Sequence, residues 1–428
     1  MEVIHIKNGR IISPADKNTG SIDEIKDLYI ADGKILFNSP QQNPDKVIDA
    51  TGMWVVPGLV DMHVHLREPG FEHKETIETG AKAAAAGGFT TIVAMPNTDP
   101  VADNCQVIQS IMDKGDALKG TKIIAAGALT IGRKGKVPVD LEEIYKVCGI
   151  TVFTDDGDGV ADDVLMENIF VNSSKTGAVI SQHSEFTHIS KKAAMHQGEV
   201  SRQLGITGQP VESEINMVRR DIELVKKTGG HLHVSHISSA GAIELVRKAK
   251  KEGLNVTAEV TPHHLHLTDE DINNYGTMAK VAPPLRTSAD VKACREALKD
   301  GTIDVIATDH APHTFDDKAG TLEDAAFGLT GLEISVPMIL QLVKDGLLSP
   351  LKMIEAMSLN PSRLLGLKGG TIKSGAVADI TIINPDAPYK IDPVTFFSKG
   401  RNTPFAGFIA PGRTAYTIKE GHIIFELE

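Results

Sequence analysis

The feature of this chain that most limits its possible folds is the alternation of apolar, β-branched runs with segments of helical period. Eight such runs recur between residues 53 and 313, among them "FTTIVAMPN", "GAVISQHSE" and "IDVIATDHAPH". Segments such as "AGAIELVRKAKKEG" lie between them, and several end in the glycine that commonly follows a helix. Eight strand–helix units predict an α/β fold in which a parallel (β/α)8 barrel of the TIM type is covered by helices.

An open, doubly wound sheet is the alternative, but no G-x-G-x-x-G follows the first strand.

The two chain ends differ from the middle: residues 1–54 and 370–428 contain short strand-like runs broken by Gly, Pro, Asn and Asp. We expect them to form one small, discontinuous β-sandwich domain, with the barrel (55–369) inserted between them. "IKNGRI" and "IKEGHI" suggest one hairpin from each end; two unrelated β extensions are the alternative.

Composition excludes several classes of protein. Of the 428 residues 41% are hydrophobic and 23% charged, which is ordinary for a globular chain, and the net charge of -12 argues against nucleic acid or an anionic membrane as a partner. No apolar stretch approaches the ~20 residues of a membrane span, and "MEVIHIKNGR" does not resemble a signal peptide, so we expect a cytoplasmic protein. Cys105, Cys148 and Cys294 lack C-x-x-C spacing and are expected to be small buried hydrophobes without disulfides or zinc.

Candidate metal ligands follow the predicted strands. "VDMHVHLREPG" sets His63 and His65 on one face at the end of the first run, where they could chelate a metal, although isolated H-x-H spacing also occurs by chance. Acids or imidazoles follow four more runs: Asp155 or Asp156 the fourth, His183 the fifth, His236 the sixth and Asp309 the eighth. Because the carboxyl ends of barrel strands meet at one rim, we expect these six groups to lie together.

Four His and two Asp without a thiolate suit Zn2+ or a similar divalent ion. Six protein ligands are too many for one catalytic zinc, so we expect two ions that share a carboxylate. His63, His65 and Asp309 would bind one ion, His183 and His236 the other, and the fourth-run Asp would bridge them. Since zinc lowers the pKa of bound water to about 7, such a site would activate water against an amide or ester.

Motifs along the whole chain carry a family resemblance. "HVHLREPG", "GGFTTIVAMPNTDP", "FTDDG", "VTPHH", "PPLR" and "TDHAPH" stand from the first run to the eighth. With them the chain resembles the amidohydrolase superfamily and, within it, the type-one bacterial dihydroorotase family. The resemblance implies reversible, zinc-dependent interconversion of N-carbamoyl-L-aspartate and L-dihydroorotate in pyrimidine biosynthesis, with two Zn2+ per chain. An allantoinase or hydantoinase, and an inactive scaffold for aspartate transcarbamoylase, are the alternatives.

The resemblance also implies roles for individual acids. Related cyclic-amide hydrolases bridge their metals with a carbamylated Lys from the fourth strand, but "ITVFTDDG" contains none, so an aspartate bridge is implied. We match this bridge to Asp155, with Asp156 as a turn residue, although adjacent acids are hard to separate by sequence. Asp309 is implied as the catalytic group that moves the proton.

Substrate contacts are implied as well. Arg67, Asn97 and His313 would hold the carboxylate that dihydroorotate has and dihydrouracil lacks, because a guanidinium pairs well with a carboxylate. The backbone at Phe327 and Gly328 would contact the ring. Ala282 stands in "APPLR" where the family has an Asn that contacts the substrate; losing one neutral hydrogen bond, about 1 kcal/mol, predicts roughly fivefold weaker interaction.

Partners and the other histidines complete these expectations. We expect a small-molecule substrate and a homo-oligomer, with aspartate transcarbamoylase as the candidate protein partner. Structural roles are expected for the remaining histidines near the sixth and seventh runs, which are His231, His233, His263, His264 and His266.

Overall fold

The computed structural model describes residues 3–17 and 19–428, and it confirms the barrel. Eight strands form it in this part of the chain: β8 (Leu59–Val64), β9 (Phe89–Ala94), β10 (Lys122–Ala125), β11 (Val152–Phe153), β12 (Val179–Gln182), β15 (His231–Val234), β16 (Val256–Val260) and β17 (Val305–Ile306). They pair in parallel in the orders β10-β9-β8 and β11-β12-β15-β16-β17. Parallel bridges Gly127–Phe153 and Val64–His310 join the two groups and close the barrel.

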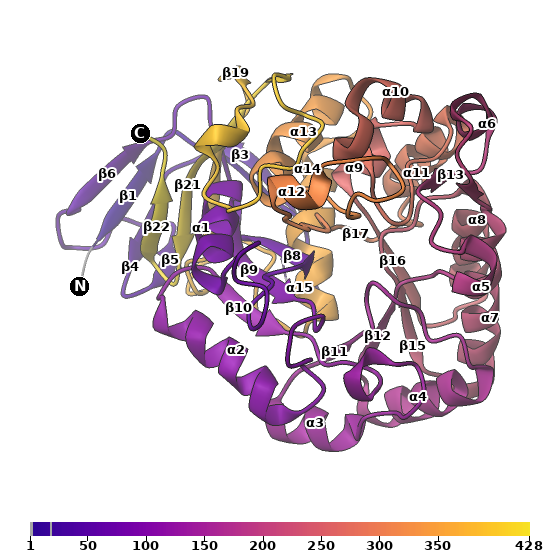
Figure 1. Ribbon diagram of the computed structural model, residues 1–428. Helices are drawn as coiled ribbons and strands as arrows, with labels where there is room; N and C mark the ends of the chain where they lie inside the picture. The colour runs from indigo at the N-terminus through magenta and orange to yellow at the C-terminus, as the bar shows by residue number, and fades with distance from the viewer. Residues whose placement is uncertain (1–2, 18) are drawn as a thin grey trace.

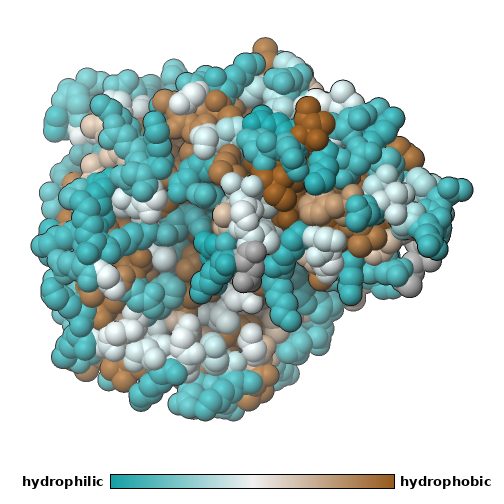
Figure 2. All heavy atoms as spheres, turned by 180° about the vertical axis from the view of Figure 1, so that it is seen from behind, coloured by the Kyte–Doolittle hydropathy of each residue, from teal (hydrophilic) through white to brown (hydrophobic). Residues whose placement is uncertain are grey.

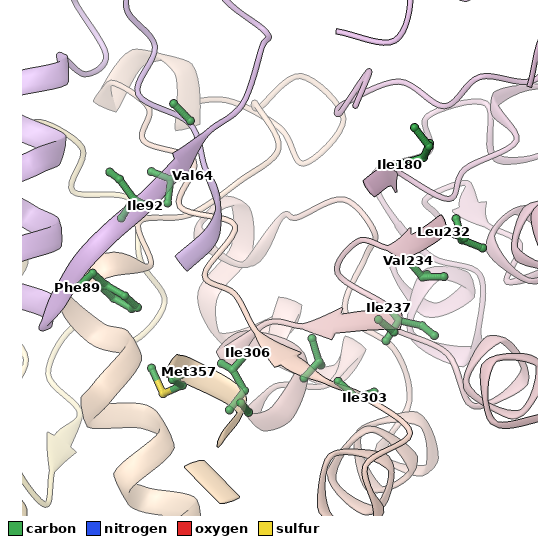
Figure 3. Close-up of a cluster of buried hydrophobic side chains, with 14 of the residues drawn as sticks. Val64, Phe89, Ile92, Ile180, Leu232, Val234, Ile237, Ile303, Ile306 and Met357 are labelled. Carbon is green, nitrogen blue, oxygen red and sulfur yellow. The ribbon is translucent and has the colours of Figure 1, made fainter. Parts of the chain in front are cut away.

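The barrel strands are nearly continuous apolar runs because both of their faces are buried. All six residues of β8 and of β9 are buried. Figure 3 shows side chains from separate strands in the apolar core, among them Val64, Phe89, Ile92, Ile180, Leu232, Val234 and Ile306. This packing holds the strands in fixed positions, so the residues that follow them are fixed as well.

Helices surround the barrel (Figure 1). The longer ones are α1 (Ile77–Gly87), α2 (Cys105–Ala117), α3 (Leu141–Cys148), α4 (Asp163–Thr176), α7 (Glu212–Thr228), α8 (Ala240–Lys251), α11 (Ser288–Asp300) and α13 (Leu332–Lys344). The expected glycine stops are present: Gly88, Gly177 and Gly229 each follow a helix with a left-handed backbone, a conformation that glycine adopts without steric strain.

Shorter elements lie in the connections. They are α5 (Thr187–Ser190), β13 (Met195–His196), α6 (Glu199–Leu204), β14 (Gly208–Gln209), α9 (Pro262–His266), α10 (Ile272–Tyr275), α12 (Phe315–Lys318), α14 (Pro350–Ile354) and α15 (Asn360–Leu364). Strands β13 and β14 pair in parallel as a short ribbon between β12 and α7.

Both chain ends build the β-sandwich. One sheet has the order β5-β4-β1-β6, from β1 (Ile4–Lys7), β4 (Leu28–Ala31), β5 (Lys34–Leu36) and β6 (Lys46–Asp49). The other has the order β22-β21-β18-β7-β2-β3, from β2 (Arg10–Ser13), β3 (Ile22–Ile25), β7 (Trp54–Pro57), β18 (Ile380–Asn384), β21 (Arg413–Lys419) and β22 (His422–Glu426). Ile6, Ile30, Ile11 and Ile382 from the two sheets share one buried cluster, as a sandwich requires.

Two local expectations differ from the structure. "IKNGRI" is not a hairpin, because β1 and β2 belong to different sheets, whereas "IKEGHI" does join β21 to β22. The first apolar run divides at Pro57–Gly58 into β7 of the sandwich and β8 of the barrel, so the boundary expected after residue 54 falls inside β7. Gly58 permits this crossing, since a Cβ there would lie 2.3 Å from the Thr90 hydroxyl.

The segment of residues 386–410 leaves the sandwich and packs against the barrel. It contains β19 (Tyr389–Lys390) and β20 (Ile409–Ala410), which pair with each other. Its Ile391, Phe396 and Phe405 share an apolar cluster with Met338 of α13. The range 370–428, expected to belong wholly to the β domain, therefore supplies part of the barrel surface.

The cysteine expectation is wrong for two of the three residues. Cys105, at the start of α2, and Cys148, at the end of α3, form a disulfide, and Cys294 is buried and free. The sequence separation of 43 conceals this pairing, because the two helix ends meet only when the strands between them are placed.

The outer surface is mostly polar. Figure 2 shows hydrophilic residues over much of one face, with apolar residues gathered in small groups between them. Within the described ranges, no helix combines the length and the apolar character that crossing a membrane requires.

Candidate active site

Strand ends bring the predicted ligands to one rim of the barrel. His63 lies in β8 and His65 directly follows it; Asp156, His183, His236 and Asp309 follow β11, β12, β15 and β17. All six residues are buried, each at most 6% exposed. Their ligand atoms form two groups that share Asp156, one with His63 and His65 and one with His183 and His236, and within each group these atoms lie within 4.8 Å of one another.

The Asp156 carboxylate lies at the centre of this cluster. Its Oδ1 is 3.2 Å from Nε2 of His63 and 3.4 Å from Nε2 of His236, and its Oδ2 is 3.4 Å from Nε2 of His65. Asp309 lies beside the first group, with Oδ1 3.1 Å from His65 Nε2. The expected cluster of four imidazoles and two carboxylates is therefore present, with Asp156 between its halves.

The assignment of the central position to Asp155 is corrected. The Asp155 carboxylate accepts hydrogen bonds from the backbone N–H groups of Leu129 (2.8 Å) and Thr130 (3.0 Å) and from the Thr130 hydroxyl. These bonds tie β11 to the segment after β10. Because successive side chains of an extended segment point to opposite sides, only one of two adjacent acids can face the imidazoles. Asp155 is the structural acid.

Partners outside the cluster orient its imidazoles. His63 Nδ1 lies 2.7 Å from Glu259 of β16, and His183 Nε2 lies 3.0 Å from Glu185. In each ring the nitrogen that faces the carboxylate donates, which leaves the other nitrogen free to bind a cation. His65 Nδ1 likewise lies 3.0 Å from Asn97 Oδ1.

The cluster fits a divalent metal. Nε2 of His63 is buried and makes no hydrogen bond, although it faces the centre of the cluster. Burial would lower the pKa of His63, but Asp156 and Glu259 together raise it well above its usual value. Burial would raise the pKa of Asp156, but His63, His183 and His236 hold it well below its usual value. Such a site attracts positive charge, and its N and O donors are those that zinc accepts.

Three residues of the site have strained backbones. Arg67, His236 and Asp309 have φ values of 61°, 33° and 49°, in the left-handed region that residues other than glycine rarely adopt. Strain of this kind persists only where surrounding contacts impose it, and it is concentrated at functional sites.

A buried network holds the chain after His236. Glu214 Oε1 accepts hydrogen bonds from the N–H groups of Ser238 (2.9 Å) and Ser239 (3.2 Å), and Glu214 Oε2 lies 3.1 Å from Arg286. Arg286 is the arginine of "PPLR" and is itself buried. This network fixes the backbone that directly follows the strained residue His236.

Arg67 and His313 lie together beside the metal ligands. An Arg67 NH2 group is 3.2 Å from Nε2 of His313, and Nε of Arg67 donates to the Pro312 carbonyl (3.3 Å). Burial lowers the pKa of Arg67 to about 10, so it is a cation at neutral pH. Burial and the neighbouring Arg67 lower the pKa of His313 to about 3, so this imidazole is neutral. One partly buried cation with a neutral imidazole beside it suits a carboxylate ligand.

The backbone at Phe327 and Gly328 is already hydrogen-bonded. The Phe327 carbonyl lies 2.9 Å from His313 Nε2, and the Gly328 N–H donates to the Lys280 carbonyl (2.9 Å). The Gly328 carbonyl accepts from Lys318 Nζ (3.0 Å). The Phe327 carbonyl and both backbone groups of Gly328 therefore already have partners, and contact of this backbone with a ring stays a prediction.

A cavity of about 270 Å³ opens over the cluster. Of the predicted site residues it is lined by His65, Arg67, Asn97, His183, His236, Asp309, His313, Phe327 and Gly328. Ala282 lines it as well, so the substituted position does face the site. His63 does not line it and lies beneath the other ligands.

Sequence reasoning missed several residues of the site. The sequence predicts a turn role for Asp156, and it gives no prediction for Glu259, Glu185 or Gln209. Glu259 carried a usable signal: it is an acid inside the apolar strand "VTAEV", and a buried carboxylate needs a partner. Glu185 and Gln209, which line the cavity, lie in irregular connections where no periodicity exposes them.

Comparisons with known proteins agree with this geometry. The Dihydro-orotase-like family matches residues 52–242, and the Amidohydrolase family matches residues 203–425. A solved L-hydantoinase (dihydropyrimidinase) from Arthrobacter aurescens superposes with a TM-score of 0.87 at 29% identity, covering 100% of this chain and 96% of that one. A solved D-hydantoinase superposes with a TM-score of 0.83 at 25% identity, covering 100% and 95%.

Sequence relatives are more similar. A dihydroorotase of Pelotomaculum thermopropionicum is 48% identical over 425 residues, covering 98% of each chain. A dihydroorotase of Anaeromyxobacter dehalogenans (strain 2CP-1) is 43% identical over 430 residues, covering 99% of this chain and 98% of its own. The chain therefore belongs to the dihydroorotase family of metal-dependent amidohydrolases.

Proposed function

We propose that this protein is a dihydroorotase that interconverts N-carbamoyl-L-aspartate and L-dihydroorotate in pyrimidine biosynthesis, with two zinc ions per chain. The observation that carries the proposal is the pair of ligand groups that share Asp156, next to the partly buried cation of Arg67 in the same cavity. The first feature suits hydrolysis of an amide, and the second suits a substrate that carries a carboxylate.

Each ion has its own set of ligands in this proposal. His63, His65 and Asp309 would hold one ion, and His183 and His236 the other, with Asp156 between them. Two bound zinc ions would polarise the ring carbonyl and supply an ionised water at neutral pH. Glu259 and Glu185 would keep His63 and His183 in the tautomers that leave the inward nitrogens free.

The protein's own groups orient the substrate and move the proton. Arg67 would bind the dihydroorotate carboxylate, and the Asn97 NH2 group and neutral His313 would add hydrogen bonds to it. Asp309 would accept the proton of the attacking water and pass it to the ring nitrogen that leaves. Burial would raise the pKa of Asp309, but His65 and His63 hold it well below its usual value, so Asp309 is ionised and ready to act as a base.

Ring closure requires the opposite state of Asp309. N-carbamoyl-L-aspartate closes with loss of water, and Asp309 must then begin protonated. Cyclisation should therefore increase toward acid pH and hydrolysis toward alkaline pH. Identical pH profiles for the two directions would contradict this role.

The cellular setting of the proposed enzyme follows from the reaction. We place it in the cytoplasm as a homo-oligomer, with aspartate transcarbamoylase, which makes N-carbamoyl-L-aspartate, as the candidate protein partner. Co-purification of the two enzymes would support the partnership, and size-exclusion chromatography would measure the oligomer.

The test is hydrolysis of L-dihydroorotate by the zinc-loaded protein, with dihydrouracil and allantoin assayed alongside. We expect metal-dependent turnover of dihydroorotate alone, and loss of that turnover in the Asp309→Asn variant, whose metal content must be measured alongside because Asp309 would also hold one ion. Preference for a neutral ring would move the protein to the hydantoinases. A metal-loaded protein without any turnover would favour the scaffold.

A further inference from the structure

We propose that Gln209 is a specificity-determining residue that binds the urea-like edge of the ring, the C=O and N–H groups that lie away from the bond that is cleaved. This inference rests on the proposed dihydroorotase function. It concerns a residue that no motif of the sequence singled out.

Gln209 is a buried amide that faces the catalytic cavity. It lines that cavity, and its side chain is almost completely buried, at 2% exposed. Among the residues that the structure describes, its side-chain oxygen and nitrogen have no hydrogen-bond partner. These two atoms are not among the fully enclosed unpaired polar atoms, so they face the open space of the cavity, where a ligand can reach both a free donor and a free acceptor.

The other polar groups of the cavity are already engaged. The Asn97 oxygen is taken by His65, and the Glu185 oxygens accept from His183 and from Ser190. The Lys192 ammonium pairs with a carboxylate outside the cavity, at 2.8 Å from Asp158. Of the two amide side chains in the lining, Gln209 alone has both its donor and its acceptor free.

Three backbone groups at Phe327 and Gly328, which line the same cavity, already have hydrogen-bond partners. The Phe327 carbonyl and both backbone groups of Gly328 are occupied by the contacts described above. Ala282, like Phe327 and Gly328, has no polar side-chain atom to offer the cavity. A side-chain hydrogen bond to the ring edge must therefore come from another residue.

The backbone of Gln209 is held firmly enough to define its position. Strand β14 pairs with β13, where Gln209 lies opposite His196, and Nδ1 of His196 lies 3.2 Å from the buried Arg286. Gly208 allows this packing, since a Cβ there would lie 2.3 Å from the Cα of Gln197. The ribbon is thereby anchored to the same network that holds His236.

The chemistry of the two groups is complementary. A primary amide presents one acceptor beside one donor, and a ring C=O with its adjacent N–H presents the matching pair. The same edge is present in N-carbamoyl-L-aspartate, so Gln209 would hold both substrate and product. Gln209 would stabilise the bound substrate and the transition state equally. Its loss should therefore raise KM and leave kcat nearly unchanged.

The experiment compares the wild type with Gln209→Met, which keeps the side-chain length and removes both polar atoms. We expect KM for L-dihydroorotate to rise by about five- to 25-fold, for one or two lost neutral hydrogen bonds, with kcat changed less than about twofold. The matched control is Gln203→Met, because Gln203 is an exposed residue of α6, close in sequence to the ribbon, and this variant should behave like the wild type.

A second substrate separates binding from general damage. In 2-thio-dihydroorotate the ring C=O becomes a C=S, a weaker acceptor. The wild type should prefer the oxygen substrate more strongly than Gln209→Met does, so the ratio of the two kcat/KM values should fall in the variant. An unchanged ratio with an active wild type would overturn this inference alone. A wild type that turns over no dihydroorotate would overturn the proposed function and this inference with it.

Discussion

Adjacent residues in this site have different roles, and Asp155 and Asp156 illustrate it. Both acids are buried after β11, yet one binds backbone N–H groups and the other faces the imidazoles. The sequence could predict that an acid from this strand end joins the cluster, because only the position of the strand was needed. It could not decide which acid, because that depends on where β11 ends and on the contacts that Leu129 and Thr130 offer.

Substitution of each acid by asparagine should separate these roles. Asp156→Asn should lose bound metal and lower kcat/KM by at least about 100-fold. Asp155→Asn should keep both ions but lower the free energy of unfolding by about 1–3 kcal/mol, because two N–H groups and a hydroxyl lose part of their acceptor. Metal analysis, kinetics and urea unfolding measure these effects. Full metal content in Asp156→Asn would contradict the central role of this residue.

Arg67 should determine preference for a charged ring. Arg67→Gln removes the cation of the cavity, so kcat/KM for L-dihydroorotate should fall by about 100-fold or more, whereas kcat/KM for dihydrouracil, which lacks the carboxylate, should rise or stay unchanged. Steady-state kinetics with both substrates provide the measurement. Equal losses for the two substrates would show that Arg67 supports the fold of the site rather than recognition.

At the scale of elements, the short helix α9 depends on its histidines. His266 Nε2 donates to the Met338 carbonyl of α13 (2.9 Å), and His264 Nε2 donates to the Pro283 carbonyl (3.0 Å). The expectation of structural roles for these residues agrees with those contacts.

The strand–helix alternation predicted the barrel, but it could not predict the path of residues 386–410, since this segment has no long periodic element and is placed by side chains such as Phe405.

His266 should make stability depend on pH. Burial, with Arg295 nearby, lowers its pKa to about 4, below the usual value near 6.5. As the pH falls from 7 to 4 the unfolded chain takes up a proton at this residue before the folded chain does, so stability is lost. The free energy of unfolding of the wild type should fall by up to roughly 3 kcal/mol more than that of His266→Gln over this range. Urea unfolding at several pH values tests this, and parallel curves would contradict it.

The whole molecule is held together at the rim as well as in the core. Five strand ends contribute six imidazoles and carboxylates to one buried cluster, so bound ions would connect β8, β11, β12, β15 and β17. The sequence predicts this architecture because eight strand–helix units indicate a barrel, and the candidate ligands follow the strands whose ends meet at one rim of it. The sequence did not predict that β7 belongs to the sandwich, because Pro57–Gly58 looks like an irregularity within one long strand.

Removal of the metals should therefore affect stability as well as activity. A chelator should abolish turnover and lower the Tm by several degrees, because the buried carboxylates lose the charge that balances them. Zinc should restore both, with about two ions per chain. Calorimetry with and without chelator measures the shift, and Asp156→Asn should show a smaller one. An unchanged Tm after verified metal loss would contradict this coupling.

The sandwich that joins both chain ends has a consequence for the order in which the protein is made. Strand β7 pairs with β18, which begins about 320 residues later, so at about 5–20 residues per second a ribosome needs roughly 15 to 65 s to supply the partner. During that interval the barrel strands emerge while β7 has one edge unpaired. Trp54, the single tryptophan, lies in β7 opposite Ile383, so its fluorescence would register the moment at which the newly made chain closes on itself.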